Sequence, residues 1–424
     1  MSTSTHFRDV RLFDGTSDSL SGTHDVVVAE GRITRIGPID GPSPDETGEV
    51  IDGGGRTLMP GLIDCHVHIM FGMLSLPELL AADPTYLGIA GATSAEAMLM
   101  RGFTSIRDCG GPAFGLKRAI DHGMVVGPRI WPSGAFISQT SGHGDFRSVA
   151  EVIPGSCSHP STTETLGGAV IADGVPEVLR GVRQQLMKGA TQIKLMAGGG
   201  VNSSYDPLDV TEYSEDELRA AVSVAEDWGT YVLVHAFTPR AVQRAIRAGV
   251  RCIDHGHLLD EETVALMVEH DVWWSMQPFL DDEFSNKNPD PVKRAKQLAM
   301  TNGTDTAYEL AKKHGAKLAW GTDALFDPAL AKAQGAQLAK MTRWFSAAET
   351  LRMATSTNAQ LLALSRERNP YPGRLGVVEV GALADLLLVD GDPLTDISLI
   401  ARPDEAFRVI MKDGIVYKNT LPKP

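Results

Sequence analysis

The chain has 424 residues, of which 43% are hydrophobic, and a formal net charge of -14 at pH 7. This size and hydrophobic content fit a globular protein with a large core, and no apolar run is long enough to span a bilayer. The acidic balance argues against nucleic acid and anionic membrane surfaces as partners.

Both ends of the chain are predicted to be β-structure. Glu30-Gly31 separates two strand-like runs near the start, and Asp413-Gly414 lies at the tip of a hairpin near the end. Neither end could bury a hydrophobic face alone. We therefore expect residues 1–57 to pair with residues 376–424 in one small β-sandwich domain.

Between these ends, residues 58–375 alternate between strand-like and helix-like patterns. Eight strands are predicted at residues 62–68, 104–108, 129–133, 192–196, 231–235, 252–255, 272–276 and 318–321. Helices are predicted between them, for example at residues 215–228 after the N-cap candidate Ser214. Eight strands alternating with helices favour a (β/α)8 TIM barrel. Residues 138–175 are the exception and are expected to form a long polar loop.

The segment from Pro60 to His68 combines a Pro-Gly turn with a short buried strand. Side chains two residues apart on a strand point to the same face. His66 and His68 are therefore expected to lie side by side at the end of the first barrel strand. Two neutral imidazoles suit a divalent transition metal such as zinc, whereas two hydrogen-bonded core histidines are the structural alternative.

Further metal-binding side chains lie at the ends of later strands. His235 ends the fifth predicted strand, His255 ends the sixth, and Asp323 follows the eighth. In a barrel, the carboxyl ends of the strands form the rim at which chemistry occurs. Each residue alone could be a satisfied core histidine or a helix cap, but their joint position at one rim predicts a metal site.

Lys194 lies within the apolar fourth strand. An ammonium group beside two dications would be strongly repelled, so two interpretations stay open. Lys194 could pair with an acid such as Asp254, or its neutral amine could react with carbon dioxide to form a carbamate. A carbamate carries two oxygens and a negative charge, and it could bridge two metal ions.

Over essentially its whole length, the chain resembles the amidohydrolase superfamily of metal-dependent hydrolases. The matching motifs are Pro60-Gly61-Leu62-Ile63-Asp64-Cys65-His66-Val67-His68, Ile193-Lys194, Val234-His235-Ala236, Asp254-His255-Gly256 and Gly321-Thr322-Asp323. The resemblance is strongest to the imidazolonepropionase-like and prolidase-like branch, which includes ochratoxin-hydrolysing amidohydrolases. It implies two divalent metal ions, with Zn²⁺ as the first candidate. By this resemblance, His66 and His68 hold one ion with Asp323, and His235 and His255 hold the other. Carboxylated Lys194 bridges both ions.

The resemblance implies hydrolysis of an amide bond, in which Asp323 takes a proton from water and passes it to the leaving nitrogen. His143 matches a Gly-His-Gly element of the prolidase-like branch and is expected to contact the substrate and assist catalysis. Tyr205 is a second candidate for substrate binding. Either residue could instead be an ordinary loop side chain.

The expected substrates are N-acyl amino acids or dipeptides with a free carboxylate, with cleavage of ochratoxin A to phenylalanine and ochratoxin alpha as one candidate reaction. A cyclic-amide hydrolase of the imidazolonepropionase type is the alternative. A non-enzymatic scaffold is disfavoured, because no ligand position is broken. The resemblance also implies a homo-oligomer, with an octamer as the candidate.

The start of the chain, Met-Ser-Thr-Ser-Thr-His, lacks a signal-peptide pattern. A cytoplasmic location is expected for this sequence, and a periplasmic or secreted one if a signal peptide has been removed. Scattered cysteines do not suggest a disulfide framework. Cys65, Cys109 and Cys252 are expected to be buried thiols, and Cys157 to lie in a loop.

Overall fold

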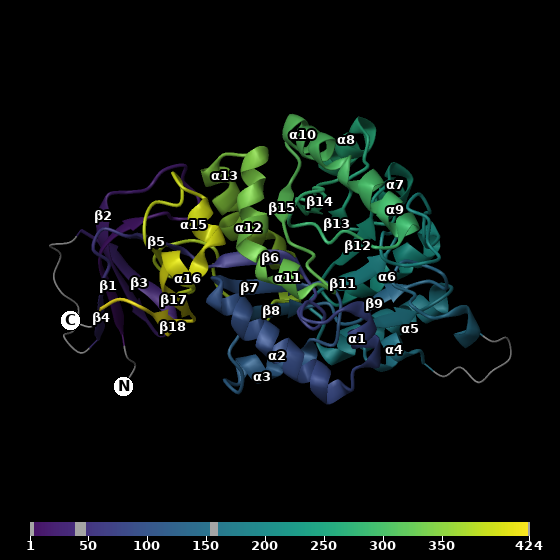
Figure 1. Ribbon diagram of the computed structural model, residues 1–424, viewed down its shortest axis with the longest axis horizontal. Coiled ribbons are helices and arrows are strands. Elements are labelled where there is room, and N and C mark those ends of the chain that lie inside the picture. Colours follow the sequence, from purple (N-terminus) through teal and green to yellow (C-terminus); the bar gives the residue numbers. More distant parts are fainter. Residues whose placement is uncertain (1–3, 39–47, 153–159, 423–424) are drawn as a thin grey trace.

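The computed structural model of the protein describes residues 4–38, 48–152 and 160–422. Elements from both ends of the chain form one eight-stranded sheet, drawn in purple and yellow in Figure 1. Its order is β18-β17-β16-β5-β1-β2-β3, and β4 pairs with β1. The strands are β1 (Thr5–Leu12), β2 (Thr23–Ala29), β3 (Arg32–Gly37), β4 (Glu49–Asp52), β5 (Thr57–Pro60), β16 (Leu386–Val389), β17 (Phe407–Lys412) and β18 (Ile415–Asn419).

Both predicted hairpins are present in this sheet. Strands β2 and β3 turn at Glu30 and Gly31, with φ angles of 52° and 71°. Strands β17 and β18 turn at Asp413 and Gly414, with φ angles of 55° and 74°. A type I′ hairpin turn needs positive φ at both central residues, which favours glycine there.

Strand β5 joins the two ends of the chain. It pairs in parallel with β1 and antiparallel with β16, and it leads directly into the next strand, β6 (Leu62–Val67). The terminal sheet therefore extends to residue 60. The division into residues 1–57 with 376–424 and residues 58–375 stays a prediction.

The rest of the chain is a mixed α/β structure with two parallel sheets. One has the order β6-β7-β8 and the other the order β10-β9-β11-β12-β13-β14-β15. The further strands are β7 (Phe103–Asp108), β8 (Arg129–Pro132), β9 (Phe136–Ser138), β10 (Ala169–Ile171), β11 (Ile193–Met196), β12 (Val232–Ala236), β13 (Cys252–His255), β14 (Trp273–Met276) and β15 (Leu318–Trp320). All eight predicted strands are thus confirmed to within one residue at each end.

Backbone hydrogen bonds also connect the two parallel sheets. Thr191 N donates to Pro132 O at 2.8 Å, next to strands β11 and β8. Asp323 N donates to His66 O at 2.8 Å, next to strands β15 and β6. These contacts bring the ends of β6 and β15 together, although the two strands are far apart in the sequence.

The prediction of a long polar loop over residues 138–175 is wrong for part of this range. Strand β10 lies within this range and pairs in parallel with β9, which ends at Ser138, and Ile137 of β9 also pairs with Leu195 of β11. Each strand has three residues, which is too short for a recognisable alternation of polar and apolar positions. Cys157 belongs to the part of this segment outside the described residues.

Most helices cover the parallel sheets, and the last two in the sequence lie beside the terminal sheet (Figure 1). They are α1 (Leu76–Ala81), α2 (Pro84–Met100), α3 (Phe114–Asp121), α4 (Thr162–Thr165), α5 (Val175–Lys188), α6 (Glu215–Asp227), α7 (Pro239–Arg247), α8 (Glu261–Glu269), α9 (Pro291–Thr301), α10 (Thr304–His314), α11 (Pro328–Lys332), α12 (Gln334–Ala339), α13 (Ala347–Arg352), α14 (Asn358–Leu362), α15 (Ser398–Ala401) and α16 (Pro403–Ala406). As predicted, Ser214 caps α6, in a reciprocal capping box with Glu217. None of the described helices has the length and apolar content needed to cross a membrane.

Candidate metal centre

A cavity of about 630 Å³ lies at the carboxyl ends of the parallel strands. The residues predicted as metal ligands all line it, namely His66, His68, Lys194, His235, His255 and Asp323, and His143 lines it as well. The strand order explains this convergence, because parallel strands place their carboxyl ends at the same edge of a sheet. Tyr205 is not among the lining residues.

A buried carboxylate holds the ends of β6 and β15 together. Asp64 accepts hydrogen bonds from Thr322 N (3.1 Å) and Thr322 Oγ1 (2.7 Å), and also from His66 N (3.0 Å). Thr322 directly precedes Asp323, and Asp64 lies two residues before His66. Asp64 therefore positions Asp323 beside His66.

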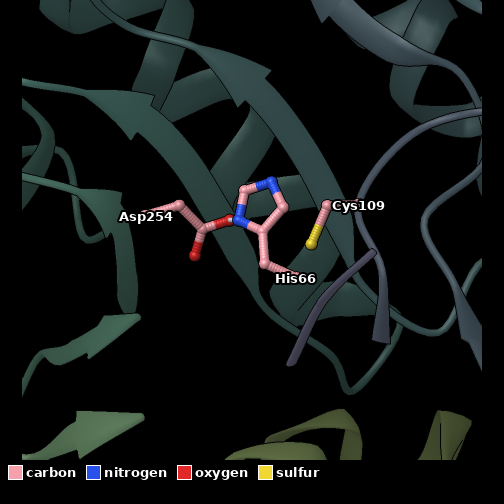
Figure 2. A group of neighbouring side chains, drawn as sticks. All are labelled: His66, Cys109 and Asp254. Carbon is pink, nitrogen blue, oxygen red and sulfur yellow. Dashed lines mark ion pairs between the residues drawn. The ribbon is translucent and has the colours of Figure 1, made fainter. Parts of the chain in front are cut away.

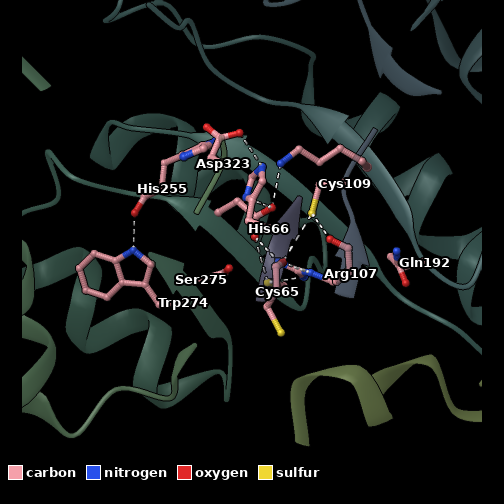
Figure 3. A network of polar contacts seen from close by, with 12 residues as sticks. Cys65, His66, Arg107, Cys109, Gln192, His255, Trp274, Ser275 and Asp323 are labelled. Atoms are coloured by element: carbon pink, nitrogen blue, oxygen red, sulfur yellow. Dashed lines mark hydrogen bonds and ion pairs between the residues drawn. The ribbon is translucent and has the colours of Figure 1, made fainter. Parts of the chain in front are cut away.

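Two imidazoles at the end of β6 converge on one carboxylate oxygen. His66 Nε2 lies 3.3 Å and His68 Nε2 lies 3.4 Å from Asp323 Oδ1. The ring of His255 is close as well, with its centroid 4.9 Å from that of His66. The nitrogen and oxygen atoms of His66, His255 and Asp323 are near enough for one metal ion to contact all three. Figure 3 shows these side chains in their polar network.

The backbone is strained at two of these positions. His255 has a φ angle of 76°, and Asp323 has a φ angle of 51°. A non-glycine residue in this left-handed region costs about 1–3 kcal/mol, and such residues cluster at functional sites. The strain supports a functional interpretation of both residues.

Burial sets the protonation of His235 and His255. It lowers the pKa of His235 and His255 well below the ordinary value, so both rings are neutral and keep a lone pair. Burial alone would raise the pKa of Asp323, but the neighbouring His66 and His68 outweigh it and lower that pKa. Burial lowers the pKa of His68 as well, but the hydrogen bond and charge of Asp323 outweigh it and raise that pKa. The cavity thus presents neutral His235 and His255 rings beside the ionised carboxylate of Asp323.

Lys194 is engaged in an ion pair. Its Nζ atom lies 2.8 Å from Asp254 Oδ2, and Arg107 NH2 lies 2.8 Å from Asp254 Oδ1. Burial opposes ionisation of Asp254, but the charges of Arg107 and Lys194 hold the pKa of this carboxyl well below its ordinary value. The pairing with Asp254 is one of the two interpretations that the sequence left open for Lys194.

Asp254 also contributes to a second group of potential metal-binding atoms, with His66 and Cys109. In this group, shown in Figure 2, the Asp254 carboxylate lies 3.2 Å from His66 Nδ1. Both oxygens of Asp254 are already taken by Arg107 and Lys194, and burial raises the pKa of the Cys109 thiol well above its ordinary value. The group with Asp323 is therefore the better metal site.

Polar partners hold three of the imidazoles through one ring nitrogen each. His68 Nδ1 donates to Gly110 O at 2.8 Å, and His255 Nδ1 donates to Gln277 Oε1 at 2.7 Å. His235 Nε2 lies 3.2 Å from Gly199 O. Such contacts set the tautomer of a metal-binding histidine and leave its other nitrogen for the metal.

His143 lies in a cradle formed by the loop after β11. Its Nδ1 atom lies 2.9 Å from Asp206 Oδ2 and 2.8 Å from Ser203 Oγ. Its ring stacks on that of His235 with a centroid distance of 4.1 Å. Its backbone N–H donates to Glu212 Oε1 at 2.8 Å. The His143 ring is thus held next to the candidate metal ligands, with Nε2 left for another partner.

Glu212 is a buried acid in this cradle. Burial raises its pKa to about 8, and the nearby carboxylates of Asp206 and Asp145 add to the rise, whereas the hydrogen bond from the His143 amide opposes it. Glu212 is therefore mostly protonated at neutral pH.

Sequence reasoning missed several residues of the site. Tyr205 is 41% exposed, whereas its neighbour Ser204 lines the cavity, so a substrate contact of Tyr205 stays a prediction. Gln277 directly follows β14, and a search of every strand end for polar residues would have found it. Arg107 and Asp206 had no such signal, because only the three-dimensional arrangement brings them to Asp254 and His143.

The model of the Amidohydrolase family matches residues 57–418 of the chain. This chain belongs to the amidohydrolase family. The match spans the parallel sheets and most of the terminal sheet. It places the cluster of His66, His68, His255 and Asp323 within the region that defines the family.

Individual relatives indicate the branch of the family to which the chain belongs. Ochratoxinase from Aspergillus niger is 33% identical over 374 residues, which cover 85% of this chain and 76% of that protein. The crystal structure of A. niger ochratoxinase matches with a TM-score of 0.85 and 28% identity, covering 99% of this chain and 96% of that chain.

Two solved peptidases are similar as well. A prolidase complexed with N-methylphosphonate-L-proline has a TM-score of 0.89 and 36% identity, covering 99% of this chain and 100% of that one. A Xaa-Pro dipeptidase with bound methionine has a TM-score of 0.82 and 29% identity, covering 98% and 100%. The chain therefore lies in the prolidase-like and ochratoxinase branch of the amidohydrolases.

Proposed function

We propose that the protein is a binuclear metal-dependent amidohydrolase that cleaves the amide bond of N-acyl amino acids or dipeptides with a free carboxylate. The observation that carries this proposal is the convergence of His66, His68, His255 and Asp323 at one end of a cavity. The names of the relatives agree with it, since both a prolidase and an ochratoxinase act on amides of amino acids.

The donor set fits divalent ions, and zinc in particular, because zinc takes nitrogen and oxygen ligands. We propose that His66, His68 and Asp323 hold one ion and that His235 and His255 hold the other. Carboxylated Lys194 would bridge both. For this, the Lys194 amine must leave Asp254, whose second cationic partner, Arg107, would stay in place to balance the carboxylate.

Bound metal ions would supply a hydroxide nucleophile and a Lewis acid for the scissile carbonyl. Asp323 would take the proton of the attacking water and pass it to the leaving nitrogen. His143, with Nδ1 held by Asp206 and Ser203, would direct Nε2 to the substrate carbonyl and stabilise the oxyanion as it forms.

The walls of the cavity favour a large apolar group on the substrate. Seven phenylalanines line it, namely Phe71, Phe136, Phe146, Phe237, Phe279, Phe284 and Phe326. Aromatic walls bind aromatic groups well in a partly dry cavity. We therefore propose N-acyl derivatives of phenylalanine as the substrates to examine first, ochratoxin A among them.

We also propose two features of the assembly. The two parallel sheets would form one closed (β/α)8 barrel, which the backbone hydrogen bonds between the two sheets support. The chain would form a homo-oligomer, with an octamer as the candidate, and light scattering of the purified protein would test that state.

A hydrolysis panel with metal analysis tests the proposed function. The panel contains N-acetyl-L-phenylalanine, dipeptides, ochratoxin A and imidazolonepropionate, and elemental analysis counts the metal ions in chelator-free protein. We expect about two ions per chain, as the number of ligands suggests, and hydrolysis of the acids. Full activity with one ion per chain would contradict the binuclear form. Cleavage of imidazolonepropionate alone would favour the cyclic-amide alternative.

A further inference from the structure

Three lysines line the cavity in the described part of the chain, and their partners differ. Lys194 pairs with Asp254 at 2.8 Å, and Lys340 pairs with Asp282 at 2.7 Å. Lys293 instead donates from Nζ to the backbone oxygen of Asn202 at 2.6 Å and forms no ion pair with a described carboxylate. Among these three lysines, Lys293 is therefore the one whose positive charge no described carboxylate balances.

Lys293 belongs to helix α9, and a second lysine of this helix, Lys296, has a purely structural role. Lys296 of α9 donates to the backbone oxygens of Gly200, Ser203 and Asp206, at 3.2, 3.4 and 2.7 Å. An ammonium group has three donors, so Lys296 has used all of them, and it does not line the cavity. Lys293 has used one, which leaves two hydrogens for a ligand.

Two loops that line the cavity hold the Lys293 ammonium in place. Asn202 belongs to the loop after β11, and its side-chain oxygen accepts from Asn288 Nδ2 of the loop after β14 at 3.4 Å. Asp290, the nearest acid in sequence, uses its Oδ1 atom to cap α9, accepting from Val292 N and Lys293 N at 2.9 Å each. The ammonium is therefore held in place while its charge stays available.

We propose that Lys293 binds the free carboxylate of the substrate, so that the scissile amide faces His143 and Asp323. This inference rests on the proposed function and names the group that selects acids over amides. A chain with a net charge of -14 repels carboxylates at long range. A half-buried, unbalanced ammonium can overcome that repulsion locally, because hydrogen bonds between charged partners are strong where water is partly excluded.

The test compares Lys293→Met with a matched control, Lys287→Met. Lys287 lies in the loop before α9, is exposed and does not line the cavity, so its replacement removes the same charge without touching the site. The substrates are N-acetyl-L-phenylalanine and its carboxamide. We expect Lys293→Met to lower kcat/KM for the acid by about 10- to 100-fold, mainly through KM, as the loss of a charged hydrogen bond implies. The carboxamide should be unaffected, and Lys293→Arg should keep part of the preference.

A binding measurement separates this inference from the proposed function. Calorimetry with L-phenylalanine, a carboxylate that has no amide to cleave, reports the anchor directly in metal-loaded protein. Weaker binding in Lys293→Met but not in Lys287→Met supports the anchor, even if no N-acyl amino acid is hydrolysed and the proposed function fails. Equal effects of both variants, or an unchanged preference for the acid in an active Lys293→Met enzyme, would overturn the anchor and leave the proposed function standing. Absence of L-phenylalanine binding at millimolar concentration would also count against it.

Discussion

Replacing Gly200 with alanine offers a sharp test of the role of His143. A Cβ atom at this position would lie 2.1 Å from His143 Cε1 and 2.2 Å from Nδ1. Gly200 does not need a positive φ angle, so alanine fits the backbone and the perturbation acts through the imidazole ring. To restore an ordinary contact of 3.4 Å, the ring must move by about 1.3 Å, the difference between 3.4 and 2.1 Å.

Such a shift is large compared with the contacts that hold the ring. It would break the 2.9 Å hydrogen bond to Asp206 or the 4.1 Å stack on His235. A displacement of about 1 Å at a catalytic group can lower a rate by roughly 10²-fold. We therefore expect Gly200→Ala to lower kcat/KM about 100-fold on whichever N-acyl amino acid the wild type cleaves, with the bound metal unchanged.

The matched control is Gly88→Ala in helix α2, where an added Cβ would meet nothing within 4 Å. Steady-state kinetics and elemental analysis are measured on both variants, with thermal unfolding to confirm that both are folded. If Gly200→Ala keeps the wild-type kcat/KM, the position of the His143 ring is irrelevant to catalysis. If metal is lost together with activity, the ring supports the metal ligands rather than the substrate.

Three further predictions follow from the site. Asp323→Asn keeps the shape of the side chain but cannot take a proton, so kcat should fall by more than the roughly 10²–10⁴-fold typical of acid–base loss; activity within tenfold of wild type would assign the base elsewhere. Lys194→Ala should lose most of the bound metal and activity, with partial rescue by short carboxylic acids, and an unchanged metal content would contradict the bridging role. Because the pKa of Glu212 is raised to about 8 from 4.5, the folded state holds this proton where the unfolded state has released it. The contribution of Glu212 to the free energy of unfolding should therefore be lost as pH rises from about 4.5 to about 8. Denaturant titrations at several pH values should show that Glu212→Gln removes this part of the pH dependence. A plot of stability against pH identical to that of the wild type would show that Glu212 ionises normally.

Local sequence patterns were sufficient to predict eight strands of the parallel sheets. Their apolar runs end at recognisable polar residues, so all eight predicted strands are confirmed to within one residue. The hairpin turns at Glu30-Gly31 and Asp413-Gly414 were equally visible, because positive φ angles restrict the choice of residue. The three-residue strands β9 and β10 carry too few positions for any such pattern, and the prediction of a loop was wrong there.

The sequence by itself determined which chemistry the protein could contain, since histidines and an aspartate at strand ends indicate metal binding before any contact is known. Only the tertiary structure decided how these residues are held. Arg107 shares Asp254 with Lys194, Gln277 orients His255, and Lys293 keeps an unbalanced charge in the cavity. These pairings join residues from different strands and loops, and their energies depend on burial and distance. The local periodicity of the chain encodes neither burial nor distance. Both are set only when the chain folds and brings residues that are distant in the sequence together.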